Sequence, residues 1–174
     1  IFRSALRGFV ESGSTKLVLD LRGNPGGYLD GAVDMASWFL PSGSIVVTED
    51  YAGNGQNIVH RSSGYDIFND NLKMVILVDE GSASASEILA IALKDHGVAR
   101  LVGTNTFGKG SVQELIEITP STSLKLTVAQ WLSPDGSHIP LTGIVPDIKI
   151  TISEEDFKAG KDPQMEKAIE MVNQ

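Results

Sequence analysis

Mostly apolar runs and helically spaced apolar residues alternate along the first half of the chain. The runs predict buried strands at residues 17–21, 45–48, 74–78 and 99–103. The helical spacing predicts helices over residues 2–10, 29–39 and about 84–95. Strands that alternate with helices favour an α/β domain.

The second half of the chain is richer in strand patterns. Alternating runs at residues 112–118 and 124–132 predict two paired strands, and residues 148–152 predict a last strand at a sheet edge. The polar stretch 49–66 is typical of a hairpin or a mobile loop. Asp162 and Pro163 predict the N-cap and first position of a C-terminal helix. We therefore expect an α/β fold with a mixed sheet and flanking helices.

Composition narrows the classes of function. A length of 174 residues fits one domain, and a net charge of −8 excludes a basic nucleic-acid surface. The chain has no cysteine, and its three histidines lack metal-ligand spacing, so we expect no metal and no cofactor. Because the chain begins with isoleucine, we expect it to be part of a longer protein.

Three serines lie where the predicted strand at 74–78 meets the following helix. Ser82, Ser84 and Ser86 alternate with alanines. A serine before a helix is usually a cap, but one cap needs only one serine. The small neighbours of Ser84 would let a substrate reach its hydroxyl, and the N–H of Ala85 could stabilise an oxyanion at the helix N-terminus. Ser84 is therefore a candidate nucleophile.

Lys109 stands between two glycines, with no acidic residue within four positions on either side. Loop lysines are usually exposed, but a lysine that is buried without a charged partner can lose its proton and act as a base. Gln113 follows four residues later and could orient the lysine amine. The turn with Gly26 and Gly27 could supply a second oxyanion donor, although a tight turn between strand and helix explains it equally well.

Four sequence blocks, in order, resemble the C-terminal processing (tail-specific) serine peptidases. The blocks are residues 19–27 (LDLRGNPGG), 81–87 (GSASASE), 106–113 (TFGKGSVQ) and 143–147 (GIVPD), and the match as a whole covers nearly the whole chain. The resemblance implies a crotonase-like ββα-spiral core and a Ser-Lys dyad assisted by glutamine. The nucleophile then falls on Ser84, the base on Lys109 and the supporting amide on Gln113.

The same resemblance implies an oxyanion hole at the N–H of Ala85 and of either Gly26 or Gly27. Residues 1–152 would form the catalytic core, which a PDZ domain precedes in the family, and residues 153–174 a C-terminal linker and helix. The implied substrates are proteins or peptides with small apolar C-terminal residues. The family implies an extracytoplasmic location in the periplasm or cell envelope. It also allows for membrane tethering and for a homo-oligomer.

Two other functions fit the same residues. One is a non-catalytic binding module, because relatives of the family include retinoid-binding repeats. The other is a hydrolase of different acyl compounds, because a Ser-Lys pair specifies only acyl transfer. The complete set of Ser84, Lys109 and Gln113 favours the peptidase, since a binding module has no chemical need for all three.

Overall fold

The computed structural model describes residues 2–68 and 71–174 and contains two four-stranded sheets. The first sheet is parallel, with the order β1-β4-β5-β8: Lys16–Asp20, Lys73–Val78, Ala99–Gly103 and Ile148–Lys149. The second is antiparallel, with the order β3-β2-β7-β6: Ile58–Arg61, Ile45–Asp50, Thr122–Leu132 and Ser111–Thr119. The α/β class is confirmed, but in place of the one mixed sheet that the sequence predicts, the parallel and the antiparallel strands form two separate sheets.

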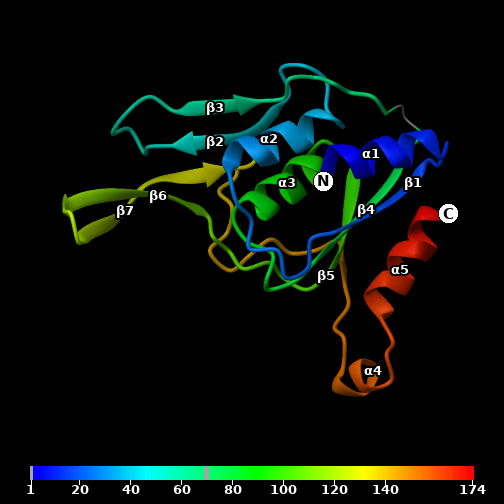
Figure 1. The fold of residues 1–174 in the computed structure, drawn as a ribbon. Coiled ribbons are helices and arrows are strands. Elements are labelled where there is room, and N and C mark those ends of the chain that lie inside the picture. The colour runs from blue at the N-terminus through cyan, green and yellow to red at the C-terminus, as the bar shows by residue number, and fades with distance from the viewer. Residues whose placement is uncertain (1, 69–70) are drawn as a thin grey trace.

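Helices lie on both faces of the parallel sheet (Figure 1). The described helices are α1 (Phe2–Glu11), α2 (Leu29–Ser37), α3 (Ala85–Asp95), α4 (Glu154–Lys158) and α5 (Pro163–Val172). Ile76 of β4 packs in the same apolar cluster as Leu89 of α3, whereas Leu77 packs with Ala168 of α5. Burial on both faces explains why β4 is a continuous apolar run rather than an alternating one.

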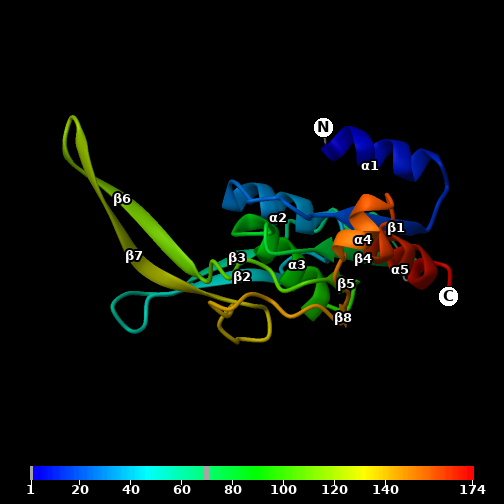
Figure 2. The same cartoon turned by 90° about the horizontal axis from the view of Figure 1, so that it is seen from below.

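The β6–β7 hairpin extends away from the body of the molecule (Figure 2). It leaves several apolar side chains exposed, among them Leu115 and Ile118. Only the β7 end of the hairpin, with Ala129 and Trp131, is buried in the body. The beginning of β6, which contains Gln113, pairs with this end of β7 and therefore lies at the base of the hairpin.

Most of the predicted elements are present at nearly their predicted bounds. The polar stretch 49–66 contains the turn and the second strand of the β2–β3 hairpin. The last strand, β8, is shorter than predicted but lies at the sheet edge. Asp162 is the N-cap of α5, and its side chain accepts a hydrogen bond from the Met165 N–H. The short helix α4 was not predicted.

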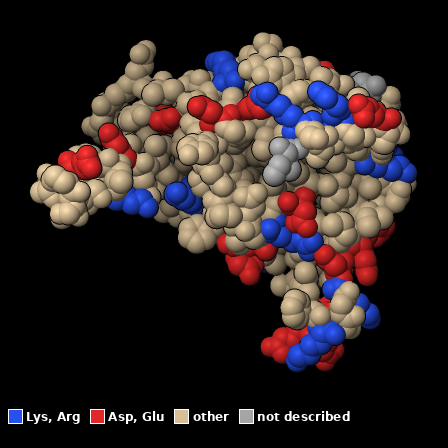
Figure 3. Space-filling model, viewed as in Figure 1, with Lys and Arg blue, Asp and Glu red and all other residues tan. Residues whose placement is uncertain are grey.

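Charged side chains of both signs are interspersed on the face shown in Figure 3. No continuous basic area covers that face. Surface charge therefore gives no support to nucleic-acid binding there.

Candidate active site

Ser84 occupies a sharp turn between β4 and α3. Its backbone has φ 56° and ψ −119°, a conformation that side-chain-bearing residues rarely adopt. Such strain costs on the order of 1–3 kcal/mol and is concentrated at functional sites. A serine held in this way at a helix N-terminus is the geometry of an exposed nucleophile.

One cavity of about 220 Å³ brings together Ser84, Lys109 and Gln113. We call it the Ser84 pocket. The other lining residues come from the turn of Gly26 and Gly27 (the glycine turn), from helices α2 and α3 and from the β6–β7 hairpin: Gly27, Leu29, Ala85, Ile88, Ser111, Val112, Lys125 and Trp131. Gln113 is exposed, while Ser84 and Lys109 are partly buried. Ser84 thus meets, at one opening, two residues that are 25 and 29 positions further along the sequence.

The other two serines of the motif lie elsewhere. The hydroxyl of Ser82 is fully buried, donates to the Leu21 carbonyl at 2.7 Å and accepts from the Asp79 N–H at 3.0 Å. Ser86 is buried and lines a different cavity. Ser84 is the member of the trio that shares a pocket with Lys109.

Glu87 joins the turn of the nucleophile to the loop of the base. Its carboxylate is 1% exposed and accepts four hydrogen bonds. The Ser84 N–H donates at 2.9 Å, the Thr106 hydroxyl at 2.5 Å, the Gly108 N–H at 2.7 Å and the Lys109 N–H at 2.9 Å. A buried carboxylate needs such donors to offset its lost hydration. Here the donors come from both halves of the site.

The glycine turn packs directly against the Ser84 turn. A Cβ on Gly26 would collide with the Ala83 carbonyl oxygen and lie 2.7 Å from the Ala85 nitrogen, so only glycine fits. The Gly26 N–H donates to Asn24 Oδ1 at 3.0 Å. Among the described residues, the N–H groups of Gly27 and Ala85 have no protein acceptor. These two groups are therefore available to an oxyanion, and Gly27 fits that role better than Gly26.

The Lys109 loop is fixed along both of its sides. The Phe107 N–H donates to the Ser82 carbonyl, and the Thr106 N–H donates to the Ile144 carbonyl. A Cβ on Gly108 would collide with the Leu141 carbonyl oxygen, so this loop lies flat against residues 139–144. The 143–147 block thus packs against the Lys109 loop. The block is itself held in place by Asp147, which accepts a hydrogen bond from the Leu101 N–H and forms an ion pair with Lys94.

The Lys109 amine forms no ion pair within the described part of the chain. It also makes no hydrogen bond to Ser84 there. No histidine is among the described residues that line the pocket. Instead His60 contacts Glu49 at 2.8 Å, and His96 contacts the Ile45 carbonyl at 2.8 Å. The surroundings of Ser84 therefore offer a lysine, rather than a histidine, as a base.

An ion-pair cluster holds the start of the glycine turn. Arg22 is 2.7 Å from Asp20 and 2.8 Å from Asp162, the N-cap of α5. The hydrogen bond from Arg22 lowers the pKa of Asp162 below its usual range. The cluster therefore ties the end of β1 to the helix on the far face of the sheet.

Sequence reasoning missed the roles of Glu87, Asn24 and Thr106. No role was predicted for Glu87, although Ser84-x-x-Glu87 has the spacing of a capping box. That spacing could have predicted the bond from the Ser84 N–H to the Glu87 carboxylate. It could not have predicted the bonds from the Gly108 and Lys109 N–H groups, because those depend on how the second loop folds back.

Comparison with known proteins gives the family of this chain. The model of "Peptidase family S41" matches residues 1–150. This chain belongs to peptidase family S41. The predicted resemblance to C-terminal processing serine peptidases is thereby confirmed at the level of the family.

Two curated relatives and one solved structure illustrate the likeness. A protein of Staphylococcus aureus (strain N315), described as "Probable CtpA-like serine protease", is 41% identical over 92% of this chain and 34% of its own length. A protein of Staphylococcus epidermidis with the same description is 40% identical over 86% of this chain and 30% of its own length. The photosystem II D1 C-terminal processing protease has a TM-score of 0.76 and 30% identity, over 89% of this chain and 40% of that one.

The S41 chain therefore spans about a third of the length of the curated relatives that it matches, 34% for the Staphylococcus aureus protein. Among the described residues, no helix is both long and apolar enough to cross a bilayer.

Proposed function

We propose that this S41 chain is the catalytic core of a C-terminal processing serine endopeptidase that works through a Ser84–Lys109 dyad. The observation that carries the proposal is the Ser84 pocket itself. Within the described part of the chain, it combines around one opening a strained serine, a lysine without an ion pair and two N–H groups without an acceptor. These are the parts that acyl transfer requires.

In the proposed reaction, the neutral amine of Lys109 takes the proton of Ser84 as the serine oxygen attacks the scissile carbonyl carbon. The N–H groups of Ala85 and Gly27 donate to the oxyanion that forms. The tetrahedral intermediate then collapses, the C–N bond breaks and Lys109 returns the proton to the leaving amine. Water then attacks the acyl carbon while Lys109 takes its proton, and Lys109 gives that proton to the Ser84 oxygen as the ester bond breaks.

Two features of the pocket concern how Ser84 and Lys109 come into hydrogen-bonding contact. Ser84 and Lys109 are not hydrogen-bonded to each other here, and catalytic hydrogen bonds often shorten only when substrate is bound. Gln113 lies on the exposed rim of the pocket. We infer that its amide accepts a hydrogen bond from the Lys109 amine and directs it toward Ser84.

We further propose that the whole protein acts outside the cytoplasm, on proteins with small apolar C-terminal residues. The name of the photosystem II D1 C-terminal processing protease supports action near protein C-termini. The location and the preference for small apolar residues are what the resemblance to the tail-specific peptidases implies. Cell fractionation tests the location: recovery of the protein in the cytoplasmic fraction alone would contradict it.

Labelling by a fluorophosphonate tests the nucleophile directly. The wild-type protein should be labelled at Ser84, and Ser84→Ala should lose the label while remaining folded. Ser82→Ala and Ser86→Ala are the matched controls and should keep the label. Lys109→Arg should label and cleave far more slowly, because a guanidinium stays protonated at any working pH.

The alternatives give different results in the same assays. A binding module would not be labelled at all. A hydrolase of other acyl compounds would be labelled at Ser84 and would cleave esters but not peptides. Loss of activity on changing one of the three histidines, with Lys109→Arg still active, would indicate a Ser-His mechanism instead.

A further inference from the structure

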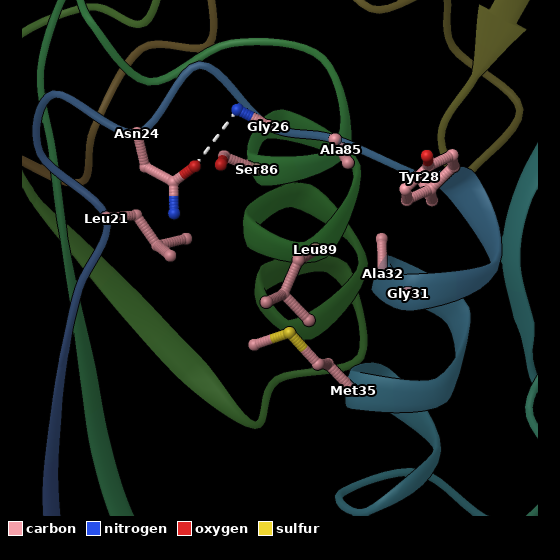
Figure 4. Close-up of a pocket in the computed structure, with 11 residues that line it drawn as sticks. Leu21, Asn24, Gly26, Tyr28, Gly31, Ala32, Met35, Ala85, Ser86 and Leu89 are labelled. Atoms are coloured by element: carbon pink, nitrogen blue, oxygen red, sulfur yellow. Dashed lines mark hydrogen bonds between the residues drawn. The ribbon is translucent and has the colours of Figure 1, made fainter. Parts of the chain in front are cut away.

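A second cavity, of about 190 Å³, lies between α2 and α3 (Figure 4). We call it the Met35 pocket. Its walls come from the glycine turn and the facing sides of the two helices: Leu21, Asn24, Gly26, Gly27, Tyr28, Gly31, Ala32, Met35, Ala85, Ser86 and Leu89. No charged side chain is among these described lining residues. The cavity therefore suits an apolar group.

The Met35 pocket opens beside the Ser84 pocket. Both cavities are lined by Gly27 and Ala85, the two residues whose N–H groups are free to hold an oxyanion. A carbonyl carbon that is attacked by Ser84 would have its oxygen at those N–H groups. The side chain on the same residue would then be next to the Met35 pocket.

We propose that the Met35 pocket binds the side chain of the substrate residue whose carbonyl Ser84 attacks, and that it selects an apolar side chain larger than that of alanine. This proposal rests on the proposed peptidase function. An engineered apolar cavity of about 150 Å³ binds benzene, so a cavity of about 190 Å³ has room for leucine, methionine or phenylalanine.

Gly31 is the residue that keeps this space open. It lies inside α2, where glycine costs roughly 0.5–1 kcal/mol relative to alanine. A Cβ at this position would meet nothing within 4 Å, so backbone crowding does not require glycine. Its φ is not in the left-handed region either. Gly31 is exposed and lines the pocket, so the absence of a side chain at this position leaves that wall of the pocket open.

Leu89 and Met35 lie at the opposite end of the pocket from Gly26 (Figure 4). Met35 is only partly buried, and its unbranched thioether can adapt to side chains of different shape. Met35 should therefore set how long a side chain can be accommodated.

The test uses fluorogenic peptides that differ only at the residue before the cut: alanine, leucine, methionine, phenylalanine or aspartate. The wild-type protein should cleave the leucine and methionine peptides at least about tenfold faster, in kcat/KM, than the alanine peptide. The aspartate peptide should be the poorest substrate, because the pocket offers its charge no partner.

Gly31→Leu should fill the pocket and reduce kcat/KM for the leucine peptide by at least about tenfold, while the alanine peptide changes little. The matched control is Gly8→Leu in α1, where a Cβ also meets nothing within 4 Å but which is not among the residues that line the pocket. It should leave both rates unchanged. Met35→Ala should shift preference toward phenylalanine, which gives a second reading if Gly31→Leu folds poorly.

The fluorophosphonate label separates this proposal from the proposed function. If Ser84 is labelled in every variant but Gly31→Leu and Met35→Ala keep the wild-type order of peptides, the Met35 pocket does not bind that side chain. An equal loss for all five peptides would also overturn the proposal. If the wild-type Ser84 is neither labelled nor active, the peptidase function itself is wrong.

Discussion

Glu87 is the residue on which the relative position of the nucleophile and the base depends most. Its carboxylate accepts from the N–H groups of Ser84, Gly108 and Lys109. In Glu87→Gln, one acceptor oxygen becomes an NH₂ group that faces N–H donors. We expect about 1–3 kcal/mol of lost stability and a fall in kcat/KM of about a hundredfold or more.

Thermal unfolding and peptide cleavage measure the two effects separately. The control is Glu80→Gln, because Glu80 is exposed and its carboxylate accepts one hydrogen bond, from Thr104. A Glu87→Gln protein with normal turnover would show that the hydrogen bonds to the Glu87 carboxylate are not needed to align Ser84 and Lys109. Slower fluorophosphonate labelling at 25 °C in a fully folded variant would indicate misalignment rather than unfolding.

At the same scale, the sequence predicted which residues meet but not how each is held. Ser84, Lys109 and Gln113 follow from motif and resemblance, and the structure places them in one pocket. Their chemical roles stay a prediction. Gly26 and Gly27 could not be told apart by sequence, because the difference is the bond from the Gly26 N–H to Asn24.

Among the elements, those with a strong apolar pattern were predictable and those without one were not. Strands β4 and β5 are mostly buried and β1 is partly buried, so their sequences are mostly apolar. The helix α4 has no buried residue, and its Ser153–Asp156 capping box provides a local signal only. The division into two sheets depends on which strands pair across long loops. The apolar pattern along the chain does not show which strands pair.

The Arg22 cluster makes the attachment of α5 depend on pH. A carboxyl whose folded pKa is lowered stabilises the fold fully above its ordinary pKa, and that contribution is lost as pH falls through the folded value. The lowered pKa of Asp162 therefore predicts a lower urea midpoint at pH 3 than at pH 7. Arg22→Gln should cost about 1 kcal/mol at pH 7 and should make the acid loss smaller.

The control for this prediction is Arg3→Gln, which removes an ion pair between Arg3 and Asp34 that is more exposed. It should keep the wild-type difference between the two midpoints. An Arg22→Gln protein that loses as much stability on acidification as the wild type would show that other carboxyl groups determine the acid sensitivity.

For the whole molecule, the relevant fact is that the S41 chain spans about a third of its curated relatives, 34% of the Staphylococcus aureus protein. The resemblance implies that a PDZ domain accompanies the core in the whole protein. Such domains bind the free carboxylate of a peptide. We expect the longer protein to cleave a peptide with a free C-terminus faster than this chain does, and to lose that advantage when the C-terminus is amidated.

The measurement is kcat/KM for both proteins on both forms of one peptide. Four equal values would mean that capture of the tail does not govern cleavage. The loops of Ser84 and Lys109 are already fixed by hydrogen bonds in this chain. We therefore expect the core to fold by itself and the difference to arise in catalysis.

The strained backbone at Ser84 has a consequence for how such proteins diverge. At φ 56° and ψ −119°, glycine is the residue with the least strain. Selection for stability alone would therefore replace this serine by glycine, and only the need for a hydroxyl opposes the change. In a descendant that has lost catalytic activity and kept the fold as a binding surface, we therefore expect glycine at position 84.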